Sequence, residues 1–509
     1  MIEIDGSQLT ISNVIAVSRS GEMVRLSDAA RQRMAQSNQW VEDIIAAQRP
    51  VYGINTGFGI FADRRISPQD TARLNRNLII SHSVATGPAL ATEIVRAAIL
   101  IRANTLASGY SGVRPLLVDT LLAMLSKKVT PLVPSQGSLG SSGDLAPLSH
   151  LALVFTTDEN DYDVESGLAE LAGNVLSGKL AMQQAGIPRI VLGPKEGLAL
   201  TNGATFSAAI AALAVADAMH LLSVAEITLA MSLEALQGVS AAFDPRLHSA
   251  RRHPGQLLVA DRVCNLIEGS TLTNPPGKVQ DAYSLRCAPQ VQGAARDAAV
   301  HTREVISREI NAATDNPLLF DQDVTISGGN FHGEPVGIVM DYLSIAMAEV
   351  GAISERRIFR LTDARLNSGL PPMLVNQITD AGLNSGMMMP QYTAASLVLE
   401  NQTLSNPDSV HSLPTSAEQE DHNANSMTAA RNTRQVLENT AHILAIEAYC
   451  AARALDLRLR EFPDARLGKG VRAAFQRIRD QVPYQAGDSL WGPEIEQVHK
   501  LILDPNFII

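Results

Sequence analysis

The stretch from Gly137 to His150 combines small, flexible residues with polar side chains, and it is the first place in this sequence to look for chemistry. Glycine loses more conformational entropy than other residues when it is ordered, and serine hydroxyls compete for backbone hydrogen bonds. The glycine- and serine-rich residues 137–144 therefore predict a loop, which lies between two apolar segments with helical patterns. Small residues in an apolar setting indicate that another group needs close access to the backbone.

Three common loop types can be compared with this stretch. A buried turn before a helix, with Ser142 or Asp144 as its N-cap, is compatible with the pattern. A phosphate-binding loop would continue with Gly-Lys-Ser/Thr, which the sequence lacks here. A serine-hydrolase elbow needs Gly-x-Ser-x-Gly, and neither Ser141 nor Ser142 has glycine two positions away on both sides. Of these three interpretations, only the capped turn is kept, and a reactive loop is the alternative to it.

The reactive alternative uses the Ser141-Ser142-Gly143 core of the loop. In a tight bend, the amide nitrogen of Gly143 can attack the carbonyl carbon of Ser141, and loss of water closes a five-membered ring. Dehydration of Ser142 then leaves an exocyclic methylene. Glycine lets its nitrogen approach, Ser142 carries the hydroxyl that is lost, and a small first residue avoids a clash. The product would be an electrophile made from the chain itself.

This loop resembles the signature of the histidine and phenylalanine ammonia-lyase family, whose 4-methylideneimidazole-5-one (MIO) arises from Ala-Ser-Gly. The match continues through residues 143–148. Ser141 stands where the family usually has alanine, and we expect cyclisation to tolerate it because the first side chain does not react. The resemblance implies an enzyme that eliminates ammonia from a small amino-acid substrate, without an external cofactor. It also implies a homotetramer in which each active site is built from three chains.

Two N-terminal motifs match the same family. Tyr52 lies in the glycine-rich residues 51–59, where a lone tyrosine is most often a packed aromatic residue. The matching family tyrosine removes the β-proton of the substrate, which requires a lowered pKa because phenols are weak bases near neutrality. Ser81-His82 resembles the Ser-His of histidine lyases, where tyrosine lyases have Tyr-His or Leu-His and phenylalanine lyases have Phe-Leu. The resemblance therefore implies that His82 binds an imidazole substrate.

A further set of polar residues is expected to bind the substrate. Gln280, Tyr283 and Arg286 are three residues apart, so on a helix they would share one face, which could also be an ordinary surface. The resemblance implies that Arg286 pairs with the amino-acid carboxylate, as guanidinium geometry allows. Gln280 and Tyr283 would complete the polar shell, with Tyr283 among the catalytic residues. Asn202 would hydrogen-bond the carbonyl of the electrophile or the substrate amine.

The remaining candidates lie in the second half of the chain. Phe331 would stack near the electrophile, and Met388 matches a pocket position. Glu420 matches a glutamate that histidine lyases place in the substrate pocket, and its carboxylate suits a polar or cationic substrate better than a bare phenyl ring. The acidic residues 418–422 are adjacent and do not point to a common centre, so no metal site is expected. Residues 423–425 make this motif two residues longer than its family counterpart.

Composition limits the classes of partner. The chain has 509 residues, a formal net charge of -11 and no basic run, so nucleic acid and anionic membranes are poor candidates. Acidic and basic residues interrupt the longest apolar stretch, residues 207–236, which is typical of a core helix and not of a membrane span. The three cysteines, Cys264, Cys287 and Cys450, lie far apart without metal-binding spacing. With no evident export signal, we expect a cytoplasmic protein.

The periodicity of apolar residues predicts a mainly α fold with a long-helix bundle. Residues 1–25 alternate and predict one or two short strands. A smaller N-terminal domain, residues 1–200, would carry the loop at 137–150, and residues 201–509 would form the bundle. Helices are expected at about residues 27–48, 70–80, 90–108, 112–125, 145–155, 285–312, 335–366, 386–404 and 424–460, with two shorter ones after residue 470.

The preferred hypothesis is conversion of L-histidine to trans-urocanate, because of His82 and Glu420. Phenylalanine or tyrosine ammonia-lyase and 2,3-aminomutase activities stay open as alternatives. A histidine betaine such as ergothioneine is another, since its leaving group is already a tertiary amine and the electrophile could be dispensable. From a different class, the chain could be a helical assembly protein without activity.

Overall fold

The computed structural model describes residues 1–376 and 382–508, which form two compact units. The first unit contains residues 1–214, 303–341 and 407–431, and the second contains residues 215–302, 342–406 and 432–509. The first unit is therefore larger than the contiguous residues 1–200 that the sequence suggested, because two later segments return to it. Apolar periodicity marks where a helix lies and does not reveal which unit it joins.

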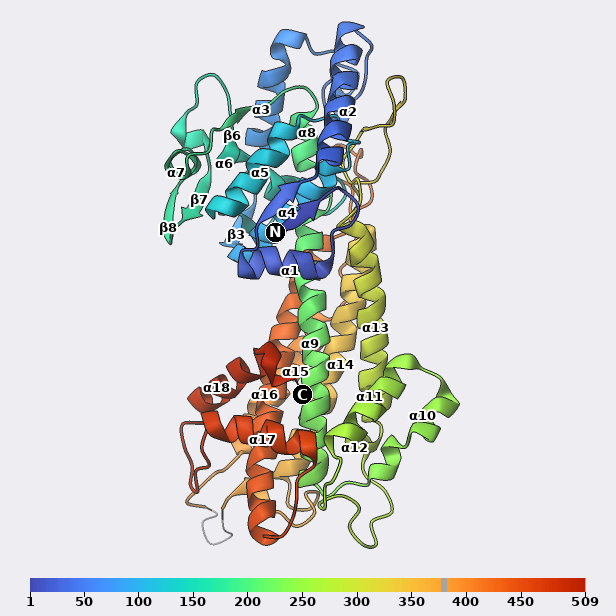
Figure 1. The fold of residues 1–509 in the computed structure, drawn as a ribbon, viewed down its shortest axis with the longest axis vertical. Helices are drawn as coiled ribbons and strands as arrows, with labels where there is room; N and C mark the ends of the chain where they lie inside the picture. The colour runs from blue at the N-terminus through green and yellow to red at the C-terminus, as the bar shows by residue number, and fades with distance from the viewer. Residues whose placement is uncertain (377–381, 509) are drawn as a thin grey trace. The chain divides into compact units, whose positions relative to one another are not determined.

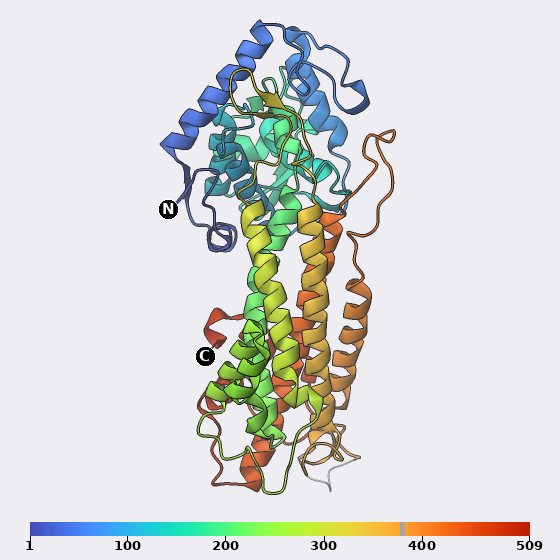
Figure 2. The ribbon, with the colours of Figure 1, turned by 90° about the vertical axis from the view of Figure 1, so that its right-hand side faces the viewer.

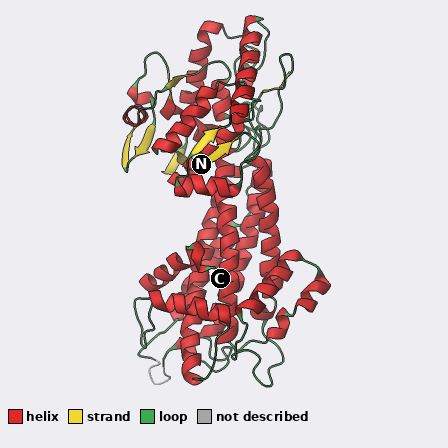
Figure 3. Cartoon of the chain, in the orientation of Figure 1, coloured by secondary structure: helices red, strands yellow, loops and turns green. Residues whose placement is uncertain are grey.

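Helices dominate both units, and the strands within the described residues all belong to the first unit (Figure 3). The helices of the first unit are α1 (Ile11–Ser20), α2 (Asp28–Ala46), α3 (Thr71–His82), α4 (Thr92–Ala107), α5 (Pro115–Lys127), α6 (Leu145–Phe155), α7 (Gly178–Ala185) and α8 (Glu196–Thr201). Its strands are β1 (Ile2–Ile4), β2 (Val24–Leu26), β3 (Thr86–Ala89), β4 (Thr130–Pro131), β5 (Pro134–Gln136), β6 (Thr156–Thr157), β7 (Leu168–Leu171), β8 (Asn174–Ser177), β9 (Ile190–Val191), β10 (Leu318–Leu319) and β11 (Thr325–Ile326).

Four long helices have residues in both units, and shorter helices complete the second. The long helices are α9 (Thr205–Ala235), α13 (Ala288–Glu309), α14 (Glu334–Thr362) and α16 (Ser426–Glu461). The second unit also contains α10 (Pro245–Arg251), α11 (Pro254–Leu266), α12 (Tyr283–Arg286), α15 (Met388–Leu404), α17 (Lys469–Gln481) and α18 (Trp491–Leu503). Within residues 1–376 and 382–508, the 3-10 helices are η1 (Gly59–Phe61), η2 (Pro68–Asp70), η3 (Asp163–Glu165), η4 (Ser240–Phe243), η5 (Pro372–Leu374) and η7 (Pro505–Phe507). These elements confirm the mainly α fold.

The N-terminal segment corrects one prediction. Strands β1 and β2 form and pair in parallel, but residues between them form α1 instead of extending the strands. The side chain of Thr10 accepts a hydrogen bond from the backbone of Asn13, and the side chain of Asn13 accepts one from the backbone of Thr10. This capping box starts the helix, and Gly21 ends it in the left-handed conformation. Local capping therefore decides the structure where the apolar alternation predicted strands.

Short strands in the first unit place His82 beside the glycine-rich loop. His82 is the last residue of α3, and β3 follows it closely. β5 directly precedes Gly137, the first residue of the loop. The two strands are antiparallel, with Thr86 opposite Gln136. Because paired strands lie about 5 Å apart, this pairing holds the end of α3 near the start of the loop.

Buried charges fix the segment that carries Asn202. The ammonium group of Lys195 lies 2.5 Å from the carboxylate of Asp315, and both side chains are fully buried. Arg102 on α4 donates hydrogen bonds to the carbonyl of Ala199 and to the hydroxyl of Thr205. Buried charges are tolerated when each has such partners. These interactions hold α8 and the residues that follow it in one position.

In the second unit, the long helices lie side by side (Figures 1 and 2). The carboxylate of Glu447 on α16 is fully buried and accepts hydrogen bonds from Arg357 and Ser354 on α14. It also accepts from Thr228 and Ser232 on α9. One carboxylate thus joins three helices of the bundle. This arrangement confirms the predicted long-helix bundle.

Two of the long helices, α9 and α14, are apolar enough to span a membrane by length and composition. However, 72% of the most apolar window of α9 and 61% of that of α14 are buried inside the protein. Such burial is typical of helices that pack against other protein segments. It agrees with the prediction that residues 207–236 form a core helix.

Candidate active site

The Ser-Ser-Gly sequence lies in a loop, as predicted, and the loop leads directly into α6. Gly143 has a φ of 81°, in the left-handed region, and an added Cβ atom would lie 2.1 Å from the carbonyl carbon of Gly203. The N–H of Gly203 donates to the carbonyl of Ser142 at 3.0 Å, and the N–H of Asp144 donates to the carbonyl of Gly203 at 2.9 Å. Only glycine fits at position 143, because the backbone at Gly203 occupies the space of a side chain.

The same geometry suits formation of an MIO from residues 141–143. Within residues 1–376 and 382–508, the amide nitrogen of Gly143 donates no hydrogen bond, so it is available to attack the carbonyl carbon of Ser141. The carbonyl of Ser142, which would remain as the ring carbonyl, accepts from Gly203 and from Asn202. The residues present therefore fit the group that the sequence predicts.

Glu420 contacts both serines of this core. The hydroxyl of Ser141 donates to Oε2 of Glu420 at 2.5 Å, and the hydroxyl of Ser142 donates to Oε1 at 2.8 Å. The turn before Glu420, residues 416–418, has three successive left-handed residues. This conformation costs L-amino acids about 1–2 kcal/mol each, so the surrounding structure must hold it. Backbone hydrogen bonds between Thr415 and Glu420 close this turn.

Asn202 lies where the sequence predicted, beside the serine core. Its Nδ2 donates to the carbonyl of Ser142 at 2.8 Å. In the described part of the chain, its buried Oδ1 has no hydrogen-bond partner. A buried acceptor without a donor costs free energy, so Oδ1 is suited to accept from a bound ligand.

His82 is held at the end of α3, with its Nδ1 3.0 Å from the hydroxyl of Ser81. Burial lowers the pKa of His82, while the backbone at Leu78 and the negative charge of Glu420 act in the opposite direction. The first unit therefore brings His82, Glu420 and the two serines into one site. Distance along the chain gave no sign of this arrangement.

Tyr52 and Phe331 lie in loops of the same unit. The hydroxyl of Tyr52 accepts a hydrogen bond from the N–H of Gly59 at 3.4 Å, and no hydrogen bond joins Tyr52 to residues 141–143 among the described residues. Phe331 is half-buried, and two residues later Gly333 donates its N–H to the carbonyl of Gly140 at 2.9 Å. This hydrogen bond places the segment of Phe331 beside the glycine-rich loop.

Asp144 is a fully buried residue of the site that the sequence analysis considered only as a helix cap. Its side chain makes no cap hydrogen bond and instead accepts from the backbone and hydroxyl of Ser207, and from the hydroxyl of Ser138 at 2.8 Å. Burial raises the pKa of Asp144, and the hydrogen bonds oppose this effect. Burial also raises the pKa of nearby Glu309 to about 7, with a further contribution from Asp144. In the sequence, the sign of this buried role was an acidic residue, Asp144, directly before the apolar residues of α6.

The other four predicted residues belong to the second unit. α12 spans only Tyr283–Arg286, so Gln280 precedes the helix, and the predicted helical face of three residues was wrong. The guanidinium of Arg286 lies 4.5 Å from the ring centroid of Tyr283 and donates to the carbonyl of Asp281. Gln280 and Tyr283 are exposed, and so is Met388, the first residue of α15.

The mainly helical fold and the Ser141-Ser142-Gly143 loop define the class of lyases that the sequence resembles. Residues 9–480 match the model of the aromatic amino acid lyase family. This chain belongs to that family. It is 48% identical over 500 residues to the histidine ammonia-lyase of Symbiobacterium thermophilum, covering 98% of this chain and 96% of that protein.

Two solved structures are similar along nearly the whole chain. The histidine ammonia-lyase of Trypanosoma cruzi matches with a TM-score of 0.90 and 36% identity, covering 99% of this chain and 94% of that one. The tyrosine aminomutase of Streptomyces globisporus matches with a TM-score of 0.92 and 34% identity, covering 99% of this chain and 97% of that one. The fold is therefore shared by proteins with different substrates.

Proposed function

We propose that this chain is an ammonia-lyase that converts L-histidine to trans-urocanate and ammonia, using an MIO formed from Ser141, Ser142 and Gly143. The observation that carries this proposal is the pair of hydrogen bonds from Ser141 and Ser142 to Glu420. Because dehydration removes the hydroxyl of Ser142, Oε1 of Glu420 then becomes available to the substrate. A carboxylate oxygen accepts readily from an imidazole N–H, whereas a phenyl ring would leave it unpaired.

His82 supports the same substrate. Burial favours its neutral form, and a neutral imidazole donates through one ring nitrogen and accepts through the other. It can therefore hydrogen-bond the substrate ring in either tautomer. The 48% identical relative named histidine ammonia-lyase supports this choice over phenylalanine or tyrosine.

The residues that surround position 142 would make the MIO more electrophilic through hydrogen bonds to its carbonyl. When formed, the MIO supplies an electrophilic methylene for the amino group of the substrate. Asn202 and the N–H of Gly203 donate to the carbonyl of residue 142, where they withdraw electron density. The buried Oδ1 of Asn202 accepts from the substrate amine. Tyr52 removes the β-proton.

The proposed enzyme is a homotetramer in which Gln280, Tyr283, Arg286 and Met388 complete active sites of neighbouring chains. In this arrangement Arg286 binds the substrate carboxylate with two parallel hydrogen bonds. Exposed apolar groups on the second unit support it, because such patches mark protein–protein contacts. They include Val279, Met388, Met389, Tyr392 and Leu399.

The proposed location is the cytoplasm. The three cysteines, Cys264, Cys287 and Cys450, are free thiols in the part of the chain that the structure describes. Free thiols are the usual state in a reducing compartment.

The test is a panel of L-histidine, L-phenylalanine and L-tyrosine with the purified protein. Ultraviolet absorption follows the unsaturated acids, and chromatography detects β-amino acids. We expect urocanate from histidine, and an intact mass that is two waters below the sequence mass. The variant Ser142→Ala should fold, retain its full sequence mass and lose turnover. A preference for tyrosine or phenylalanine, or β-histidine as the main product, would contradict the proposal.

A further inference from the structure

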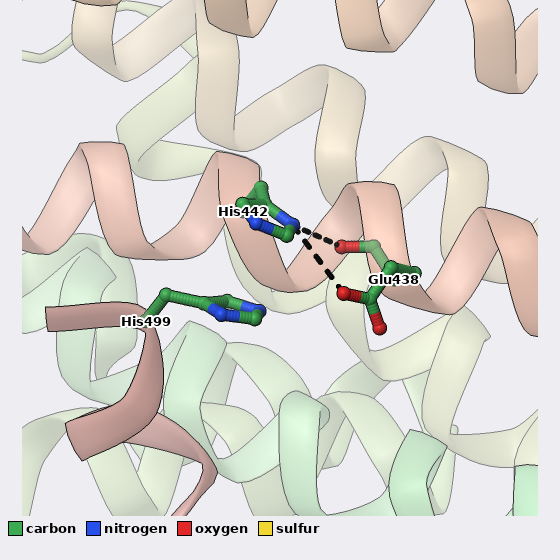
Figure 4. A group of neighbouring side chains, drawn as sticks. All are labelled: Glu438, His442 and His499. Carbon is green, nitrogen blue, oxygen red and sulfur yellow. Dashed lines mark hydrogen bonds and ion pairs between the residues drawn. The ribbon is translucent and has the colours of Figure 1, made fainter. Parts of the chain in front are cut away.

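Two helices of the second unit bring together histidines and glutamates that have no part in the proposed reaction (Figure 4). α16 carries Glu438 and His442, and α18 carries His499. One ligand atom from each of these three side chains lies within 4.8 Å of the other two. This is the one group of this kind among the residues that the structure describes.

The helical spacing adds a fourth residue. Glu438 and His442 are four residues apart on α16, and Glu496 and His499 are three residues apart on α18. Residues at these spacings lie on one face of a helix. Each helix therefore offers a carboxylate and an imidazole toward the other. Glutamate–histidine pairs of this kind serve as metal ligands in helix bundles.

The orientation of His442 suits a metal ligand. Its Nδ1 lies 3.0 Å from the backbone carbonyl of Glu438, and a carbonyl only accepts, so Nδ1 carries the proton. The lone pair is then on Nε2, which lies 3.7 Å from a carboxylate oxygen of Glu496. Metal-binding histidines usually donate their second ring nitrogen to a carbonyl or carboxylate in this way.

His499 is the strongest indication of a missing partner. Only 5% of this residue is exposed, yet neither of its ring nitrogens has a hydrogen-bond partner in the described structure. Its Nδ1 lies 3.8 Å from a carboxylate oxygen of Glu496.

The separations of 3.7 and 3.8 Å are too long for hydrogen bonds. They are close to the distance between two ligands of a tetrahedral zinc ion, about 3.4 Å for bonds of about 2.0–2.1 Å. The rings of His442 and His499 stack with centroids 3.8 Å apart and planes 18° apart. Because parallel rings do not aim at one point, one ring must turn, and His499 can do so without breaking a hydrogen bond of its ring nitrogens in the described structure.

We propose that His442, His499, Glu496 and Glu438 bind one divalent transition-metal ion, for which Zn²⁺ is the fitting choice, and that the ion fastens α18 to α16. Two imidazoles and two carboxylates form a donor set for zinc, whereas Mg²⁺ and Ca²⁺ prefer oxygen ligands alone. Residues 418–422 predicted no metal site because their adjacent side chains do not point to a common centre. Here the ligands come from two helices that tertiary packing brings together.

The test uses the full-length protein after dialysis against a chelator. Calorimetric titration with ZnCl₂ should give one site per chain, and zinc should raise the thermal unfolding midpoint. Co²⁺ should give the intense visible spectrum of tetrahedral coordination. Glu496→Gln and His442→Gln should each weaken zinc binding at least about tenfold. Both side chains are at least partly exposed, so these variants should fold.

The matched control is His253→Gln, which removes an exposed histidine of the second unit that lies outside the cluster. It should bind zinc as the unchanged protein does. The proposal is overturned if the unchanged protein binds no zinc at micromolar concentrations. Zinc affinities of both ligand variants equal to that of the unchanged protein, or a loss of affinity in the control as large as in the ligand variants, would also overturn it.

Discussion

In the proposed mechanism, Glu420 takes part both in formation of the electrophile and in recognition of the substrate. Before cyclisation it accepts from both Ser141 and Ser142, and the hydroxyl of Ser141 remains after that of Ser142 is lost. Ser141, where the family usually has alanine, thus has a physical role as an anchor for Glu420. In the proposed mechanism, Ser141 holds one oxygen of the carboxylate and the other is available to the substrate.

Replacing Glu420 with glutamine should lower kcat/KM for histidine roughly 10- to 100-fold, because hydrogen bonds to a charged group contribute about 1.5–3 kcal/mol. The amide is of nearly equal size, so the fold should persist. Steady-state kinetics on histidine and phenylalanine would measure the effect. A larger loss for phenylalanine than for histidine would contradict the assigned role.

Replacing Ser141 with alanine should leave electrophile formation intact and raise KM for histidine several-fold. The reason is the loss of one hydrogen bond to Glu420, typically about 1 kcal/mol. Intact mass reports the loss of water, and kinetics reports KM. If the variant has both an intact electrophile and unchanged KM, Ser141 does not anchor Glu420.

At the scale of elements, buried carboxylates on long helices set the packing of the second unit. Glu447 joins α9, α14 and α16 through fully satisfied hydrogen bonds. Glu234 on α9 is different. One of its oxygens accepts from the N–H of Gly468, and the other is buried without a partner in the described structure. Burial accordingly raises the pKa of Glu234 to about 8.

Replacing Glu447 with alanine should reduce the free energy of unfolding by about 3–5 kcal/mol, because it leaves the buried guanidinium of Arg357 without its partner. Chemical denaturation would measure this loss. A second substitution, Arg357→Met, on the same background should recover part of it. Independent, additive effects of the two substitutions would contradict the proposed coupling.

Glu234 should make stability depend on pH. Its folded pKa of about 8 exceeds the ordinary value of 4.5, so between these values the folded state binds more protons than the unfolded state. The contribution of Glu234 to the free energy of unfolding is therefore fully present below about pH 4.5 and is lost as the pH rises to about 8. In the Glu234→Gln variant this decrease should be smaller. The thermal unfolding midpoint of the variant, relative to that of the unchanged protein, should therefore rise from pH 5 to pH 8. A constant difference across this range would contradict the assignment.

For the whole molecule, the proposed assembly would cover apolar and aromatic surface that one chain leaves exposed. Tyr283 is 68% exposed beside Arg286, and Leu399 on α15 is 64% exposed. In the proposed tetramer these surfaces meet neighbouring chains and bring the carboxylate-binding residues to the electrophile. Activity and assembly should then be inseparable.

Replacing Leu399 with glutamate should dissociate the tetramer and abolish activity, because a charge would enter an apolar interface. Light scattering would give the mass, and activity would be measured on the same fractions. The control is Leu247→Glu, at a leucine on α10 that is 53% exposed. An active monomer would contradict shared active sites.

Features that depend on near neighbours along the chain were predictable from the residues alone. Apolar residues at helical spacing predicted α3, α6, α15 and α16 closely, and adjacent serine, serine and glycine at 141–143 indicated the loop in which the electrophile is proposed to form. Predictions from apolar or helical spacing were wrong where another local interaction determined the backbone conformation. The capping box at Thr10 produced a helix in an alternating pattern, and Gln280 fell before a very short helix.

Contacts between residues that are far apart in the sequence became visible only in the tertiary structure. Glu420 reaches Ser141 and Ser142 because residues 407–431 return to the first unit, and no apolar pattern encodes that return. His442 and His499 likewise meet because α18 packs beside α16. Such contacts follow from the burial of whole helical faces, which is a property of the complete chain. Helices and the glycine-rich loop depend on residues that are neighbours in the sequence, whereas the proposed substrate site depends on tertiary packing.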